Sequence, residues 1–104
     1  MSIEFYAQNV RGIIDEVNRD ITKMNSSDYK TLMVQACFDK LRSAGNSIDD
    51  MERELILVPI NERSQVTNRI KGFRNEISSL EEKLQNGKQR ALLLGDASNL
   101  PNAP

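Results

Sequence analysis

The sequence predicts an all-α fold, an antiparallel up-down-up three-helix bundle with a left-handed twist. Three stretches repeat apolar residues at spacings of three and four, the pattern of a helix that buries one face. Short polar links separate these stretches, so each helix must run antiparallel to the one before it. The 104 residues suit one domain. We therefore expect one bundle over residues 1–87, followed by a tail over residues 88–104.

The first predicted helix runs from residue 2 to residue 24, with Ser2 as its candidate N-cap. Gly12 costs about 1 kcal/mol of helix propensity, which the strong apolar pattern outweighs. Residues 25–28 are Asn, Ser, Ser and Asp, whose side chains favour caps and turns. The apolar seam of this helix consists of Ile3, Tyr6, Val10, Ile13, Val17, Ile21 and Met24.

The second predicted helix, residues 27–58, is the middle of the bundle. Phe38 and Ile56 widen its apolar stripe, so it should contact two partners. It should end before Pro59, which disfavours helical backbone in its predecessor. Its length of about 48 Å against about 35 Å for the first helix predicts an overhang, or an irregularity near Gly45 and Asn46. Its seam consists of Val34, Cys37, Leu41, Ala44, Ile48, Met51, Leu55 and Val58.

The third predicted helix runs from a cap at Asn61 to residue 86. Gly87 follows Asn86 and is predicted to end the helix as a left-handed C-cap. Gly95 and Pro101 oppose further helix, so residues 88–104 are expected to form a flexible, mostly disordered linker. The seam of this helix consists of Val66, Ile70, Phe73, Ile77, Leu80 and Leu84.

Composition excludes several classes of function. Fourteen basic and fifteen acidic residues give a net charge of −1, so the chain lacks the positive field of a general nucleic-acid binder. There is no His, and the single Cys37 lies on a predicted core seam, so a zinc cluster or a histidine base is excluded. The five glycines are isolated and form no phosphate loop. We expect no enzyme, no cofactor, no metal and no small-molecule substrate.

Location can also be predicted from the composition. A single cysteine in a chain without a signal-peptide pattern agrees with a reducing compartment, so we expect the chain to face the cytosol. No apolar run approaches the roughly 18 residues of a membrane span. The acidic run at residues 49–54 is interleaved with Arg53 and lacks a glycine-centred calcium loop, so it is interpreted as a solvated helical face.

A specific order of short motifs links the second and third helices. Residues 47–55 read Ser-Ile-Asp-Asp-Met-Glu-Arg-Glu-Leu, Val58-Pro59 follow, and residues 69–80 contain the basic-aromatic-basic element Lys71, Phe73 and Arg74. Residues 89–94 read Gln-Arg-Ala-Leu-Leu-Leu. This order resembles the N-terminal domain of the Vti-type Qb SNAREs, over residues 43–94. Residues 1–42 agree with that family in helix pattern and length only.

The resemblance implies an Habc-type bundle that precedes a SNARE motif and a C-terminal membrane anchor, both expected beyond Pro104. In that family the SNARE motif zippers with cognate SNAREs to fuse membranes on Golgi and endosomal routes, at the cytosolic face. The bundle binds trafficking adaptors, including ENTH-domain proteins. The family's adaptor contacts do not transfer residue by residue. From the residues alone, we expect the protein-binding surface where the second helix meets the third, at Arg53, Leu57, Arg63 and Arg74.

Two other hypotheses remain open. The heptad helices are also typical of a structural module, either a spectrin-like repeat or a self-assembling coiled coil with no fusion role. Concentration-dependent helicity would favour assembly, and a monomer with cooperative melting would favour an isolated domain. An autoinhibitory bundle would need an outer apolar groove, for which the sequence offers only the scattered off-stripe residues Phe5, Leu32 and Leu57. Autoinhibition therefore ranks below adaptor binding.

Overall fold

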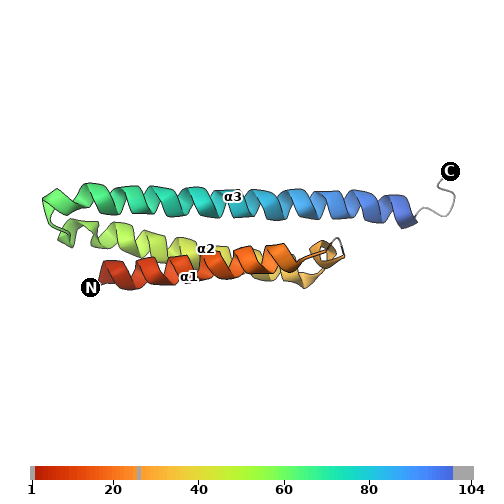
Figure 1. Ribbon diagram of the computed structural model, residues 1–104, viewed down its shortest axis with the longest axis horizontal. Helices are drawn as coiled ribbons and strands as arrows, with labels where there is room; N and C mark the ends of the chain where they lie inside the picture. The colour runs from red at the N-terminus through yellow and green to blue at the C-terminus, as the bar shows by residue number, and fades with distance from the viewer. Residues whose placement is uncertain (1, 26, 100–104) are drawn as a thin grey trace.

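The computed structural model describes residues 2–25 and 27–99 and shows a three-helix bundle (Figure 1). Helix α1 spans Ser2–Lys23, α2 spans Leu32–Glu54 and α3 spans Ile60–Asn99. Two short 3₁₀ segments, η1 (Asp28–Lys30) and η2 (Leu55–Leu57), lie at the two turns. Helix α2 runs antiparallel to α1 and α3, and the described residues contain no strand (Figure 1). The predicted fold class is confirmed.

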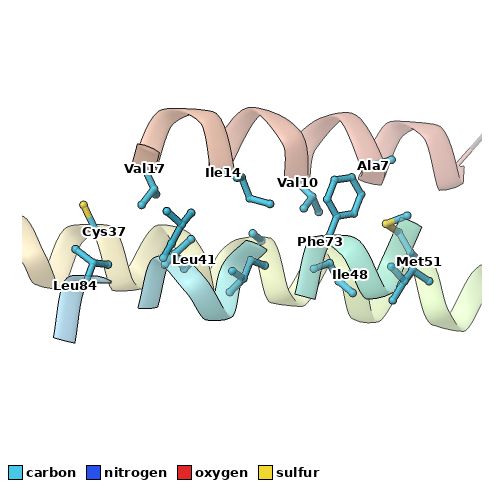
Figure 2. Close-up of a cluster of buried hydrophobic side chains, with 14 of the residues drawn as sticks. Ala7, Val10, Ile14, Val17, Cys37, Leu41, Ile48, Met51, Phe73 and Leu84 are labelled. Carbon is cyan, nitrogen blue, oxygen red and sulfur yellow. The ribbon is translucent and has the colours of Figure 1, made fainter. Parts of the chain in front are cut away.

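The core is one continuous apolar cluster to which all three helices contribute (Figure 2). The predicted seams of α2 and α3 are buried wherever those helices are flanked by both partners. In α1, the fully buried positions include Ala7 and Ile14, whereas Tyr6 and Ile13 are only partly buried. Helix α1 faces two helices, so its buried stripe is wider than a single seam. The fully enclosed large side chains are Val10, Ile14, Val17, Cys37, Leu41, Ile48, Met51 and Leu84.

The start of α2 differs from the sequence prediction. The helix begins at Leu32 rather than near Ser27, because Thr31 is the N-cap and its Oγ1 accepts a hydrogen bond from the Met33 amide at 3.1 Å. Before it, the Asn25 side chain accepts from the backbone amides of Ser27 at 3.0 Å and Asp28 at 3.2 Å. These polar side chains stabilise a turn at the residues where the sequence predicted the first turn of this helix.

The end of α2 also comes earlier than predicted. The helix ends at Glu54, residues 55–57 tighten into η2, and Val58 is extended (φ −83°, ψ 136°) ahead of Pro59. Helix α2 therefore has 23 residues against 22 for α1. The predicted length mismatch between these two helices is wrong, and α2 passes through Gly45 and Asn46 without a break.

The third helix does not end at Gly87, and this prediction is wrong. Helix α3 has 40 residues and continues to Asn99, so residues 88–99 extend the helix beyond its predicted end. Residues 100–104 of the predicted linker lie outside the described part of the chain. The helix projects past the turn between α1 and α2 (Figure 1). It is α3 that supplies the overhang.

Gly87 allows a close contact with another segment and does not end the helix. No glycine in the described chain has positive φ. The ring of Tyr29, from η1, packs against Gly87 so closely that a Cβ there would lie 2.7 Å from the ring Cδ1 atom. One turn later Ala91 is 2% exposed. The η1 segment thus braces α3 where it leaves the bundle.

The alanine substitution Gly87→Ala tests this contact against Gly72→Ala in the same helix. A Cβ at position 72 meets nothing within 4 Å, so Gly72→Ala should raise the free energy of unfolding by about 0.5–1 kcal/mol through helix propensity. Gly87→Ala should lower it by about 1 kcal/mol or more, because the Tyr29 ring must move. Urea denaturation followed by far-UV circular dichroism measures both. Equal stabilisation by the two changes would show that the ring contact is dispensable.

Candidate protein-binding surface

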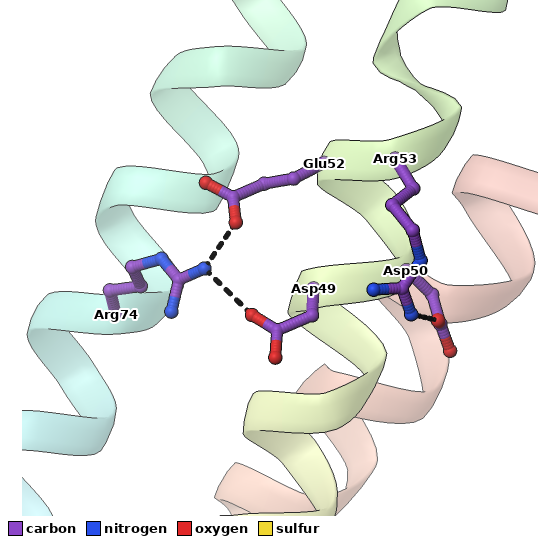
Figure 3. Close-up of polar contacts among 5 residues, drawn as sticks. All are labelled: Asp49, Asp50, Glu52, Arg53 and Arg74. Carbon is purple, nitrogen blue, oxygen red and sulfur yellow. Dashed lines mark hydrogen bonds and ion pairs between the residues drawn. The ribbon is translucent and has the colours of Figure 1, made fainter.

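Arg74 lies between α3 and α2 and is committed to contacts within the bundle (Figure 3). Its Nη2 donates to Asp49 Oδ1 at 3.2 Å and to Glu52 Oε1 at 2.5 Å, both on α2. Burial acts to lower the pKa of Arg74, but its hydrogen bonds to the two carboxylates outweigh this and raise it. Its side chain remains 44% exposed, so solvent weakens the pairs. Arg74 holds α3 in register against α2.

Arg53 does not share a face with Arg74. It pairs with Asp50, three residues earlier in the same helix, and its side chain is 71% exposed. Figure 3 shows this pair on the side of α2 away from Arg74. The predicted patch is therefore split across two flanks of α2. Arg53 is its most exposed cation.

Arg63 braces the turn between α2 and α3. Its Nε donates to the Val58 carbonyl at 2.8 Å, and its Nη2 donates to the Ile56 carbonyl at 2.9 Å. These carbonyls follow the end of α2, where helical partners are lacking. Arg63 is half-buried by this role. It holds the turn that carries the neighbouring apolar residues, and its contacts in the described ranges are with carbonyls rather than carboxylates.

Leu57, the fourth predicted residue, belongs to a group of exposed apolar side chains at this end of the bundle. Leu57 is 70% exposed, Ile56 74% and Ile60 79%. We call these three residues the apolar tip. Ile56 was expected to widen the buried stripe of α2, but the switch from α-helix to η2 rotates it away from the core. Ile60 was missed because it was predicted to be part of a link, and its position just after Pro59 was the available signal.

A groove adjoins the apolar tip, between the first turns of α1 and α3. Its volume is about 500 Å³, and we call it the end groove. Of the other predicted off-stripe residues, Phe5 is exposed in the first turn of α1, at this end of the bundle, and Leu32 is exposed at the opposite end of α2. The end groove is lined by Ile3, Glu4, Glu54, Leu57, Val58, Pro59, Glu62, Gln65, Val66 and Arg69.

No metal-binding centre emerges in the part of the chain that the structure describes. Three or more metal-binding side chains do not converge anywhere in residues 2–25 and 27–99. Cys37 is buried, and its desolvation raises the pKa of its thiol. None of the described helices combines the length and the hydropathy that crossing a bilayer requires.

Comparison with known proteins identifies the family. The family of the vesicle transport v-SNARE protein N-terminus matches residues 1–88. The chain belongs to this v-SNARE family. No curated protein and no solved structure matches it. The role of this v-SNARE domain is in vesicle transport, and a domain of this family is a trafficking module rather than an enzyme.

The arginine contacts of this v-SNARE domain can be tested by Arg74→Gln, with Arg53→Gln as the matched control. Arg74 joins two helices, whereas Arg53 pairs only within α2. Arg74→Gln should lower the free energy of unfolding by about 0.5–1 kcal/mol and Arg53→Gln by a few tenths, on the order of an exposed helix pair. Urea titrations at low and high salt measure this, and high salt should shrink the difference. An equal effect of both changes would contradict the register role.

Proposed function

We propose that this bundle is the N-terminal regulatory domain of a Vti-type SNARE that docks a trafficking adaptor in transport between Golgi and endosomal membranes. The apolar tip is the observation that carries this proposal. Three large aliphatic side chains stand at least 70% exposed on one turn of a v-SNARE domain. Contiguous exposed apolar residues rimmed by polar ones are typical of protein interaction sites.

The order of motifs at residues 47–80 supports the Vti-type assignment. The acidic stretch, Pro59 and the basic-aromatic-basic element lie in the order of that subfamily. The assignment implies that cognate SNAREs pair through a following SNARE motif, at the cytosolic face of the membrane. An ENTH-domain protein is the kind of adaptor it implies for the bundle.

The predicted surface residues take different parts in this docking. Leu57 is an exposed apolar anchor, and Arg53 is an exposed cation four residues before it. Arg63 and Arg74 act indirectly, because they fix the turn and the α2–α3 register that present the tip. Binding energy in such surfaces is concentrated in a few anchors, so Leu57 should matter most.

The exposed leucines at the two ends of α2 provide the test. Leu57→Ser should weaken binding to an ENTH-domain adaptor about tenfold or more, the cost of losing an anchor. Leu32→Ser is the matched control, since Leu32 is 84% exposed at the other end of the bundle. Isothermal titration calorimetry measures the affinities, and circular dichroism should show unchanged helicity for both variants. Arg53→Gln should have a smaller effect than Leu57→Ser.

Two outcomes would contradict the proposal. Equal affinity of Leu57→Ser and Leu32→Ser would remove the apolar tip from the adaptor surface. A wild-type bundle that binds no adaptor and associates with itself as concentration rises would favour the self-assembling module instead. Sedimentation velocity over a range of concentrations distinguishes a monomer from such an assembly.

A further inference from the structure

The end groove exists because the α2–α3 turn reaches past the first turn of α1 (Figure 1). Elsewhere the apolar seams of α2 and α3 are buried against the other helices. At the end groove, Val58 and Val66 continue the seams of α2 and α3 but stay only partly buried. At the groove, α2 and α3 therefore lack the third helix that covers them elsewhere, because α1 begins only beside it. Its shape suits a helix.

The length of the groove sets the size of its occupant. Its α3 wall extends from Glu62 to Arg69, with Val66 between them. Seven residues of helix cover about 10 Å, or two turns. A helical segment of two to three turns would therefore fill the groove. Apolar side chains spaced by three or four residues would reach Leu57 and Val66.

The charge of the groove determines the chemistry of the occupant. Of its four charged side chains, Glu4 and Arg69 neutralise each other at 2.9 Å. Glu54 and Glu62 form no ion pair with any residue in the described ranges. An apolar floor with two uncompensated carboxylates on its walls favours a segment that carries basic residues beside its apolar face.

The nearby arginines strengthen this assignment. Arg53, Arg63 and Arg74 are engaged by Asp50, by two backbone carbonyls and by two α2 carboxylates, respectively. Arg53 and Arg74 are therefore balanced by carboxylates, whereas Arg63 keeps its charge. Carboxylates still outnumber guanidinium groups among these residues and the groove lining, so the surplus is negative. An acidic partner, which three free arginines would favour, does not fit here.

We propose that the end groove binds a basic amphipathic helix of a partner protein. Its apolar face packs on Leu57, Val58 and Val66, and its Lys or Arg side chains pair with Glu54 and Glu62. The proposal rests on the proposed function, because it names the partner chemistry of the docking end. A membrane with anionic lipids is a poor occupant, since the two carboxylates would repel it.

A synthetic peptide tests the groove without any adaptor. The probe is a fluorescein-labelled three-turn helix of Leu and Lys, with Leu at spacings of three and four. Its acidic counterpart, with Glu in place of every Lys, should not bind. Glu54→Gln/Glu62→Gln should weaken the basic peptide about tenfold in fluorescence anisotropy, through the loss of two ion pairs. The matched control Glu81→Gln/Glu82→Gln removes the same charge from exposed positions of α3 and should change affinity less than twofold.

Leu57→Ser tests the apolar contribution to binding separately from the electrostatic one. It should also weaken binding of the basic peptide about tenfold. Equal losses in the two glutamine pairs would show non-specific attraction and overturn the proposal. The proposal would also be overturned if the bundle bound phosphatidylcholine vesicles, or associated with itself, and Leu57→Ser abolished that binding or association. Peptide binding without adaptor binding would overturn only the proposed function. Adaptor binding that is unaffected by Glu54→Gln/Glu62→Gln would overturn only the proposal for the end groove.

Discussion

The structure depends on close contact between α1 and α2. Ala7, Val10, Ile14 and Val17 of α1 are all fully buried, as are Ala44, Ile48 and Met51 of α2. Alanines at facing seams let the two backbones approach, and the larger side chains then fill the space around them. Because the ion pairs between helices are partly exposed, each adds little to stability. Apolar burial supplies most of the stabilising free energy.

The polar contacts between helices determine register instead. Asn9 donates to the Ser47 hydroxyl at 2.8 Å across α1 and α2, and Lys40 reaches Asp20 of α1 at 2.9 Å. Arg11 holds Glu76 of α3 in a bidentate pair. Each pair of helices therefore has its own polar match, and a slip by one turn would leave these groups unpaired. A uniform apolar seam could not make that distinction.

Sequence periodicity predicted the helix interiors well and the helix ends poorly. A seam is repeated over six or more residues, whereas an end is decided by one group, such as the Thr31 hydroxyl or the extended Val58. Gly87 looked like a stop because the contact it serves comes from Tyr29, far away in the chain. The exposure of Leu57 followed from its angle on the helix. The partners of Arg74 did not, because they depend on how α2 and α3 are rotated against each other.

The unbroken α3 connects the two ends of the domain. The family match stops at residue 88, yet the helix continues through Ala91 to Asn99. Its 40 residues span about 60 Å. The apolar tip and the end groove lie at its first turns, and the brace by Tyr29 lies where it leaves the bundle. A partner docked at the first turns is held tens of ångströms from residues 88–99, so it leaves them open to other contacts. The proposed adaptor site and residues 88–99 therefore lie at opposite ends of one continuous helix.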